Sequence, residues 1–519
     1  MELLKKQIHC NKIGKKIFDQ FYIDEDYNVP DTKSDVMRIV QGNGYIKVED
    51  MKSVENYLRV TGKLYFQILY VAEEGEPRLA AIEGRIPFEE MIYTEDNNLD
   101  HFYIYHSRVE FHAALIHSRK LDIKAMIELE IGREELKDEE ITIDVEGKTG
   151  IFKKKKNMEL LQMHTCKKDT YRIKEEAGIP GTKENIGSIL LTDISSRKLD
   201  TRLGQDELFI RGEIQVFCLY LSEESKEDWI ELNVPFEGRV DCYGVDENMY
   251  HHVITSLEDS SIDIRPDEDG EMRILGIEGT LELRIQIYEE EMLEVLEDAY
   301  SLEEQCKLEK KEGVYEELLL RNQSKCKISE QLSLPEVKDD ILQICHSNGL
   351  VQVERMDMVE EGIQIEGILH ISFLYIKSND EVPFATWKGM IPFSYLVEGS
   401  HNGKEVSFDI DSSLEQLSVS MAGSEEVEIK AILAFNSFLR TPVLVPIITN
   451  VEFAPLVIEE MSKRPGIIAY TVKEGDTLWD LAKNYSTTVE GMKEMNRISE
   501  DNLKQGDKIL IFKENMSIL

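Results

Sequence analysis

The sequence has no long apolar segment. Its 519 residues include no run approaching the ~18 apolar residues of a membrane-spanning helix, and the most apolar stretch, Val443–Ile448, is broken by Pro446. Residues 1–10 lack the apolar core of about 7–15 residues that marks a secretory signal peptide. We therefore expect a protein that is made, and acts, on the cytoplasmic side of a membrane.

Cysteine and basic residues are scarce. The seven cysteines are scattered without a CxxC pair, a pattern typical of reduced thiols and not of a disulfide framework. The 60 Lys and Arg residues are outnumbered by 101 Asp and Glu residues, for a net charge of −41. Because so acidic a chain repels phosphate backbones and anionic lipid, we expect no nucleic-acid partner, and a basic or apolar partner surface instead.

Motifs of catalysis and cofactor binding are missing: there is no GxxxxGK[ST], GxGxxG after a strand, HExxH or GxSxG. His251 and His252 are neighbours, which point to opposite faces of a strand. Asp267–Gly270 lacks the closing glutamate of a calcium loop and is interpreted as a hairpin turn. Cys218 and Cys345 lie in apolar surroundings, where thiols are usually inert. We predict no enzyme activity, no cofactor and no metal site.

A threefold internal repeat is present instead. Each copy has an isoleucine seven residues before a proline, a lysine three residues after it, a glycine 32 residues after it, and a later Pro-Phe pair. The three prolines are Pro30, Pro180 and Pro335, the glycines are Gly62, Gly212 and Gly367, and the pairs begin at Pro87, Pro235 and Pro392. The period is 150 to 155 residues.

Each copy has the pattern of a β domain. Segments such as Leu64–Leu69 and Leu281–Ile287 alternate or are rich in β-branched and aromatic residues, and turn signals separate them. The pattern predicts a mainly β chain with three repeated sandwich-like or barrel-like domains over residues 1–152, 159–300 and 313–460.

Two smaller features are predicted around these domains. Since proline tolerates the first turn of a helix, a short helix is expected after each repeat proline, over Thr32–Ile39, Thr182–Leu190 and Lys338–Cys345. The basic run Lys153–Lys156 and the Glu-rich stretch Glu289–Glu317 are interpreted as linkers.

The last fifty residues have a different pattern. Thr477 and Asp480 form a capping box at the start of a helix whose apolar face includes Leu481 and Tyr485. A second helix is expected to begin at Thr487 and to end near residue 496, between strands at residues 468–472 and 508–512. We predict a small α+β domain, of order βααβ, over residues 467–513.

This order of elements, with Gly-Asp-Thr-Leu at the first turn, resembles the LysM domain family. LysM domains commonly bind N-acetylglucosamine chains in a shallow groove between two loops. The resemblance places the binding residues at Gly475, Asp476, Thr477, Leu478, Asn496, Arg497, Ile498 and Leu503. From the pattern alone, Leu478 is expected in the core, and Asp476 and Thr477 at a turn and a cap. Trp479 lies one step off the apolar face and is a candidate exposed contact.

Three β domains followed by one LysM module resemble the SipL-like family of spore-coat morphogenetic proteins, whose β domains are of the SPOCS type. The resemblance implies a non-enzymatic assembly protein of the mother-cell cytoplasm, located at the forespore surface. It also implies that the LysM module binds the coat-basement ATPase SpoIVA and supports coat encasement. A peptidoglycan-binding protein of the spore cortex or cell wall is the alternative, although one LysM module gives little avidity for glycans. An enzyme with an unfamiliar site would need clustered perturbed side chains in one copy, and the sequence indicates none.

Overall fold

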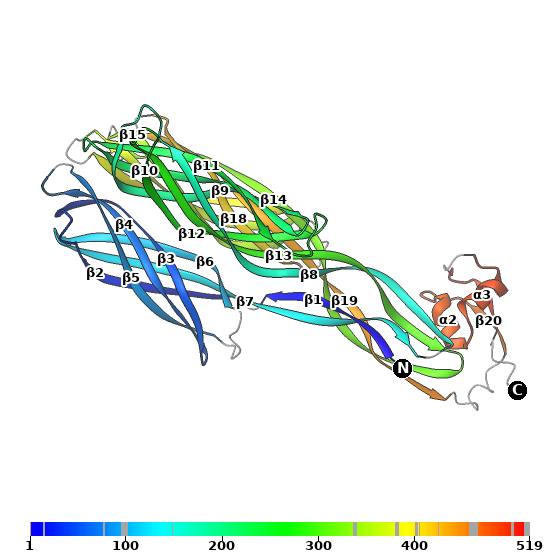
Figure 1. Cartoon of the computed structure of the whole chain (residues 1–519). Helices are drawn as coiled ribbons and strands as arrows, with labels where there is room; N and C mark the ends of the chain where they lie inside the picture. The colour runs from blue at the N-terminus through cyan, green and yellow to red at the C-terminus, as the bar shows by residue number, and fades with distance from the viewer. Residues whose placement is uncertain are drawn as a thin grey trace.

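The chain forms an elongated β structure with a broad head, a narrow stalk and a small helical module at the end of the stalk (Figure 1). The computed structural model describes residues 2–13, 16–75, 78–94, 102–147, 149–335, 340–378, 383–399, 403, 405–423, 425–455, 466–499 and 503–512. Within these residues, no helix has the length and apolar character needed to cross a membrane.

Each repeat folds as a sandwich of two antiparallel sheets, as predicted. In the first unit, one sheet has the order β2-β7-β6 and the other the order β3-β4-β5. The bounds are β2 Ile17–Asn28, β3 Val36–Val54, β4 Tyr57–Ala72, β5 Leu79–Tyr93, β6 Phe102–His117 and β7 Lys120–Glu146. Period-two burial along β4, with Leu58, Val60, Leu64 and Phe66 inside, explains why this segment forms a sandwich strand.

The second and third units repeat this arrangement. Their sheets β11-β10-β9 and β15-β16-β17 correspond to β3-β4-β5, while β8-β13-β12 and β14-β19-β18 correspond to β2-β7-β6. The bounds are β8 Ile151–Gly178, β9 Ile186–Gly204, β10 Glu207–Ser222, β11 Glu227–Asp241, β12 Tyr250–Pro266, β13 Met272–Ser301, β14 Glu304–Ser333, β15 Ile341–Val359, β16 Gly362–Lys377, β17 Phe384–Glu398, β18 Ser407–Met421 and β19 Glu426–Pro455. Because β8 also pairs with β14, the second and third units share a six-stranded sheet.

The three units meet in an apolar junction, here called the central cluster. Its buried members are Leu69, Val71, Leu79, Leu190, Leu191, Phe217, Leu219, Leu221, Cys345, Leu374 and Phe384. Leu69, Leu219 and Leu374 occupy the same position of the repeat, since each lies seven residues after the repeat glycine of its copy, Gly62, Gly212 or Gly367. A leucine at the same repeat position of each domain therefore contributes to the contact between the three domains.

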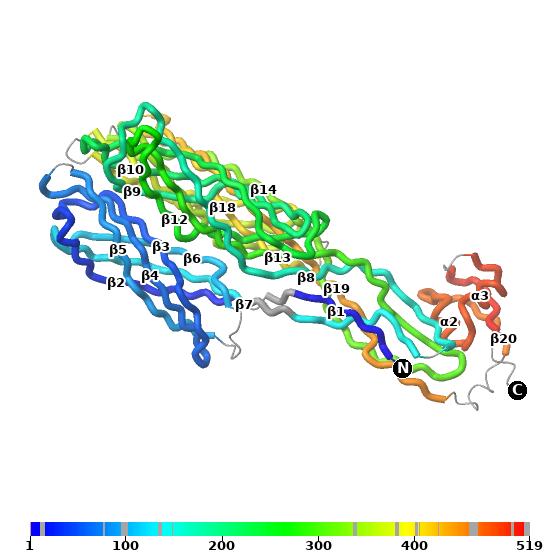
Figure 2. The backbone as a smooth tube through the Cα atoms, viewed as in Figure 1, coloured from blue at the N-terminus to red at the C-terminus, as the bar shows by residue number. Residues whose placement is uncertain are grey.

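The stalk consists of strand extensions that leave the three sandwiches on the same side. It contains β1 (Glu2–Ile13) and the outer parts of β7, β8, β13, β14 and β19, which pair as β1–β7, β8–β13 and β14–β19. Its buried side chains are Ile8, Cys10, Ile141, Val145, Leu160, Leu293, Val295, Leu296, Tyr315, Val445, Ile447 and Ile448. Figure 2 shows the N-terminus at the far end of this stalk.

The two predicted linkers are therefore wrong. Lys153–Lys156 lies within β8, and Glu289–Glu317 spans the end of β13 and the start of β14. Half of each strand extension faces solvent, and its charges pair across strands: Lys154 with Glu297 at 3.1 Å, and Lys153 with Asp144 at 2.6 Å. Solvent-facing charge, not lack of structure, accounts for the acidic and basic runs.

The predicted helices after the first two repeat prolines are also wrong. Pro30 and Pro180 are followed by a turn, in which the amides of Lys33 and Lys183 donate to the proline carbonyls, and then by β3 and β9. The guanidinium of Arg119 donates to the carbonyl oxygens of Val29, Pro30 and Lys33 and so satisfies this turn without a helix. In the third copy, residues 336–339 lie outside the described residues, and β15 begins at Ile341.

Candidate functional site

The C-terminal module has the predicted order β20 (Ile467–Thr471), α2 (Leu478–Tyr485), α3 (Val489–Asn496) and β21 (Lys508–Phe512). Thr477 caps α2: its hydroxyl accepts from the Asp480 amide at 3.1 Å and donates to the Asp480 carboxylate at 2.6 Å. The predicted N-cap is confirmed, and the Asp480 carboxylate contacts this cap through the Thr477 hydroxyl. The second cap is Thr488, which accepts from the Gly491 amide, so the prediction of Thr487 was one residue early.

The first loop, between β20 and α2, is held by its own polar groups. Gly475 has φ +86, a left-handed conformation in which a side chain is strained, and it is exposed. The Asp476 carboxylate accepts from the Lys473 amide and from the Tyr470 hydroxyl, each at 2.8 Å. These bonds to the Lys473 amide and the Tyr470 hydroxyl lower the pKa of Asp476. Asp476 and Thr477 therefore form the turn and the cap, as expected from the pattern.

The second loop, between α3 and β21, begins with Asn496. The side-chain amide of Asn496 donates to the Leu510 carbonyl at 2.7 Å and accepts from the Leu510 backbone N–H at 2.7 Å. These two bonds connect α3 to β21. Arg497, with φ 54, ends the helix and is exposed. Ile498 and Leu503 are part-buried against the core of the module. Residues 500–502 lie outside the described residues.

The two loops lie side by side, because Val472 exchanges backbone hydrogen bonds with Gly506 and Asp507. Leu478 is buried, with 2% of its surface exposed, and so belongs to the core, as the pattern predicted. Of the nine candidate residues, Gly475, Thr477 and Arg497 are exposed in the loops, and the others serve mainly the fold of the module. Among the candidates, only Gly475, Thr477 and Arg497 are therefore open to a ligand from solvent.

Trp479 is part-buried and turns its indole toward the stalk, so the expected exposure is only partial, and its role as a ligand contact stays a prediction. Its indole N–H donates to the Asp298 carboxylate of the stalk at 2.8 Å. Its ring meets the Tyr300 ring edge-on, with centroids 4.9 Å apart. Trp479 therefore fixes the module to the stalk.

Asp298 is the polar centre of this junction, and sequence reasoning missed it. Lys483 of α2 places its ammonium 2.7 Å from one carboxylate oxygen of Asp298 and 2.8 Å from the other. Burial alone would raise the pKa of Asp298, but the hydrogen bonds from Lys483 and Trp479 and the charge of Lys483 lower it. The Asp298 carboxylate is therefore stabilised in its charged form between two side chains of α2.

Tyr300 completes the junction between the stalk and the module. It is 3% exposed, lies in the same apolar cluster as Leu478 and Leu481, and donates from its hydroxyl to the Thr487 carbonyl at 2.9 Å. Phe152 of β8 stacks on the Tyr300 ring, with the ring centroids 5.0 Å apart. Asp298, Tyr300 and Phe152 lie more than 160 residues before the module, so no local pattern could link them to it.

Comparison with protein families gives matching assignments. The LysM domain model matches residues 470–512. The SipL SPOCS domain model matches residues 35–111, 185–265 and 340–422, one segment in each repeat. The chain carries three SPOCS domains and one LysM domain. Both are non-catalytic binding domains, and this content is that of a protein related to the spore coat. No curated protein and no solved structure matches the chain.

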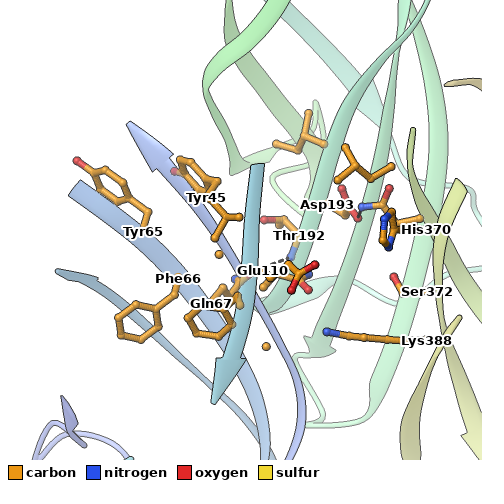
Figure 3. A pocket seen from close by; sticks show the side chains of 18 of the residues that line it. Tyr45, Tyr65, Phe66, Gln67, Glu110, Thr192, Asp193, His370, Ser372 and Lys388 are labelled. Atoms are coloured by element: carbon orange, nitrogen blue, oxygen red, sulfur yellow. Dashed lines mark hydrogen bonds between the residues drawn. The ribbon is translucent and has the colours of Figure 1, made fainter. Parts of the chain in front are cut away.

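The three SPOCS domains together line an open cavity of about 1100 Å³ with mixed polar and apolar walls (Figure 3). Its polar groups mainly join one domain to another. The Asp193 carboxylate of the second domain accepts from Asn348 at 2.5 Å and bonds His346 at 3.0 Å, both in the third domain. The Gln67 side chain of the first domain accepts from the Thr192 amide of the second at 3.4 Å. The cavity lining thus helps to hold the SPOCS domains in register.

The histidine pair, the two apolar-site cysteines and the Asp267–Gly270 segment, which the sequence suggested only weakly as chemical sites, have structural surroundings. His251 and His252 are buried, and desolvation lowers the pKa of each to about 4. Burial raises the pKa of the Cys218 and Cys345 thiols to about 12. Asp267 accepts backbone bonds within its hairpin turn. Across the described residues, no three His, Cys, Asp or Glu side chains are grouped to hold a metal ion.

Proposed function

We propose that this chain is a non-enzymatic spore-coat assembly protein whose LysM domain binds the coat-basement ATPase SpoIVA and so supports encasement of the forespore. The observation that carries the proposal is the placement of the LysM domain. It is attached to the end of the stalk by α2, while Gly475 and Arg497 of its loops are exposed. A binding module held at the end of a rigid β stalk suits a scaffold that presents one surface to a large partner.

Attachment of α2 to the stalk favours binding for an entropic reason. A module on a flexible tether loses orientational freedom when it binds, whereas a docked module has already lost it. The buried Tyr300 and the Asp298–Lys483 ion pair provide this preorganisation. The proposed cellular site is the forespore surface, reached from the mother-cell cytoplasm.

Binding of the full-length chain to purified SpoIVA tests the proposal. Arg497→Glu reverses a charge in the exposed second loop, and we expect it to weaken binding at least about tenfold, the equivalent of 1.4 kcal/mol. Arg202→Glu is the matched control, since Arg202 is 71% exposed on the head and far from the loops in sequence. If the unaltered chain did not bind SpoIVA, the proposal would be refuted.

Binding to peptidoglycan is the second candidate function, and the paired loops of the LysM domain favour it. Co-sedimentation of the full chain with purified peptidoglycan measures it directly. Retention that is lost in Arg497→Glu but kept in Arg202→Glu, together with no affinity for SpoIVA, would establish the glycan as the ligand. Altering Asp476 or Thr477 is less informative, because both hold the loop itself.

A further inference from the structure

The first SPOCS domain presents an aromatic edge strand to solvent. Phe18 and Tyr22 on β2 are 75% and 70% exposed, while Phe21 and Ile23 on the other face are buried. Within the described residues, β2 has β7 as its backbone partner, so it forms an edge of its sheet. Figure 1 shows β2 at the margin of the first domain. A long edge strand with exposed aromatic residues is a template for pairing with another strand.

The other two domains supply an internal comparison. Counted from the repeat isoleucines Ile23, Ile173 and Ile328, the positions of Phe18 and Tyr22 are occupied by Lys168 and Arg172 in the second copy, and by Gln323 and Lys327 in the third. Charged side chains on an edge strand oppose pairing with another chain. Only the first copy has two aromatic residues at these positions, so this edge is chemically distinct from the other two.

We propose that β2 pairs with β2 of a second copy of this chain, antiparallel and centred on Gln20. In this register Phe18 of each copy lies opposite Tyr22 of the other, and Lys16 lies opposite Asp24. Phe18, Gln20, Tyr22 and Asp24 are exposed on the outer face of β2, and Lys16, which immediately precedes the strand, is exposed too. A shift of two residues in either direction breaks both aromatic pairs. The register is therefore set by the sequence of the strand itself.

The chain contains a related contact between two of its own domains. The second and third domains share the order β12-β13-β8-β14-β19-β18, in which β8 and β14 lie next to each other and meet at Leu161 and Glu316, the positions that correspond to Asn11 of β1, just before β2. Pairing of β2 between two copies would produce the equivalent order, β6-β7-β2 followed by its symmetric partner. An interface of this type is self-complementary, as a twofold dimer requires.

The dimer would carry two LysM domains. β1 of the stalk and β2 pair in the same direction with β7, so an antiparallel β2 pair points the two stalks in opposite directions and places the LysM domains at opposite ends of the dimer. Pairing through the heads leaves both stalk ends, and therefore both sets of LysM loops, unobstructed by the interface. This consequence holds whether the ligand is a protein or a glycan, so the inference does not depend on the proposed function.

Sedimentation of the full chain over a range of concentrations tests the inference. We expect a species with twice the mass of the 59.9 kDa chain. Phe18→Lys with Tyr22→Arg, which introduces the residues of the second copy, should shift the equilibrium to monomer, raising the dissociation constant at least tenfold. Tyr243→Arg is the control, because Tyr243 is 79% exposed on another domain. A wild-type monomer, or a dimer unaffected by the double substitution, would refute the pairing.

A cysteine substitution tests the register. Gln20 is opposite itself in the proposed pair, so Gln20→Cys should form an intermolecular disulfide under mild oxidation. Asp24→Cys lies on the same face, opposite Lys16, and should crosslink far less. Equal crosslinking by the two variants, or none by Gln20→Cys in a chain that still dimerises, would overturn the proposed register.

Discussion

The central cluster of the head and the junction between the stalk and the LysM domain join parts of the chain by different means. The central cluster consists of apolar side chains from three domains, and Leu69, Leu219 and Phe217 in it are fully buried. The junction combines the buried Tyr300 with a carboxylate, an ammonium and an indole N–H. Apolar burial is nearly independent of pH and salt, whereas a partly exposed ion pair depends on both. We therefore expect the contact between the three domains to be nearly insensitive to pH and salt, and the attachment of the LysM domain to depend on both.

The largest effect is expected from the central cluster. Leu219→Ala removes a fully buried side chain at the meeting point of the three domains and should lower the free energy of unfolding by about 2–5 kcal/mol. Chemical denaturation followed by far-UV circular dichroism measures it. Leu342→Ala, at a position that is 66% exposed, should change the stability by less than about 0.5 kcal/mol. Equal losses in the two variants would contradict an apolar junction.

A smaller and more local effect is expected at the stalk end. Asp298→Asn removes the charge that Lys483 and Trp479 share and should weaken docking of α2 by about 1.5–3 kcal/mol, while the head stays folded. Hydrogen exchange should rise in residues 478–485 and at Tyr300, and remain unchanged in the central cluster. Glu297→Gln is the neighbouring control, since Glu297 pairs with Lys154 on the stalk surface. Unchanged exchange in α2 would mean that packing alone holds the module.

The same junction should respond to acid. The pKa of Asp298 is lowered in the docked state from an ordinary value of 3.8, so the charged carboxylate stabilises docking above about pH 4. This stabilisation should be lost as the pH falls from 3.8 through the lowered docked-state pKa. Hydrogen exchange in α2, measured between pH 3 and pH 6, should show this loss in the wild-type chain and not in Asp298→Asn. An identical pH dependence in both chains would assign the effect to other carboxylates.

The smallest effect is expected inside the LysM domain. Thr477→Ala removes the cap of α2 and should destabilise the module by about 1 kcal/mol. Thr477→Ser keeps the hydroxyl and should behave nearly as the wild type. Thermal unfolding of the module, monitored through hydrogen exchange at the Leu481 amide, distinguishes the alanine variant from the serine variant. If the serine variant lost as much as the alanine variant, the threonine methyl group and not the cap would be responsible.

Much of the architecture could be predicted from the sequence because its signals are local. Period-two burial in β4 and the helix cap at Thr477 act within a few residues, so the sandwiches and the LysM domain were identified correctly. The stalk could not be recognised in this way. Its strands pair within each copy, but their apolar side chains need packing partners from all three copies. The run Lys153–Lys156 alone has the composition of a solvated linker.

The candidate site was predicted in part for the same reason. The chain order places the loops correctly, but the role of Trp479 depends on Asp298, which lies 181 residues away. Helical periodicity shows that Trp479 is off the module's apolar face, and it does not show which surface covers it. The turn after Pro30 was mistaken for a helix because Arg119, which binds its carbonyls, is also distant in sequence.

The stalk has a consequence for the order in which the molecule assembles during synthesis. Each sandwich draws its strands from one repeat, and it can form once that repeat has left the ribosome. The stalk interior also needs Val445 and Ile447 from the last strand of the third repeat. Until these residues emerge, Ile8 and Ile141 have no complete interior to enter. The stalk interior can therefore be completed only after all three repeats have been synthesised, just before translation reaches the LysM domain.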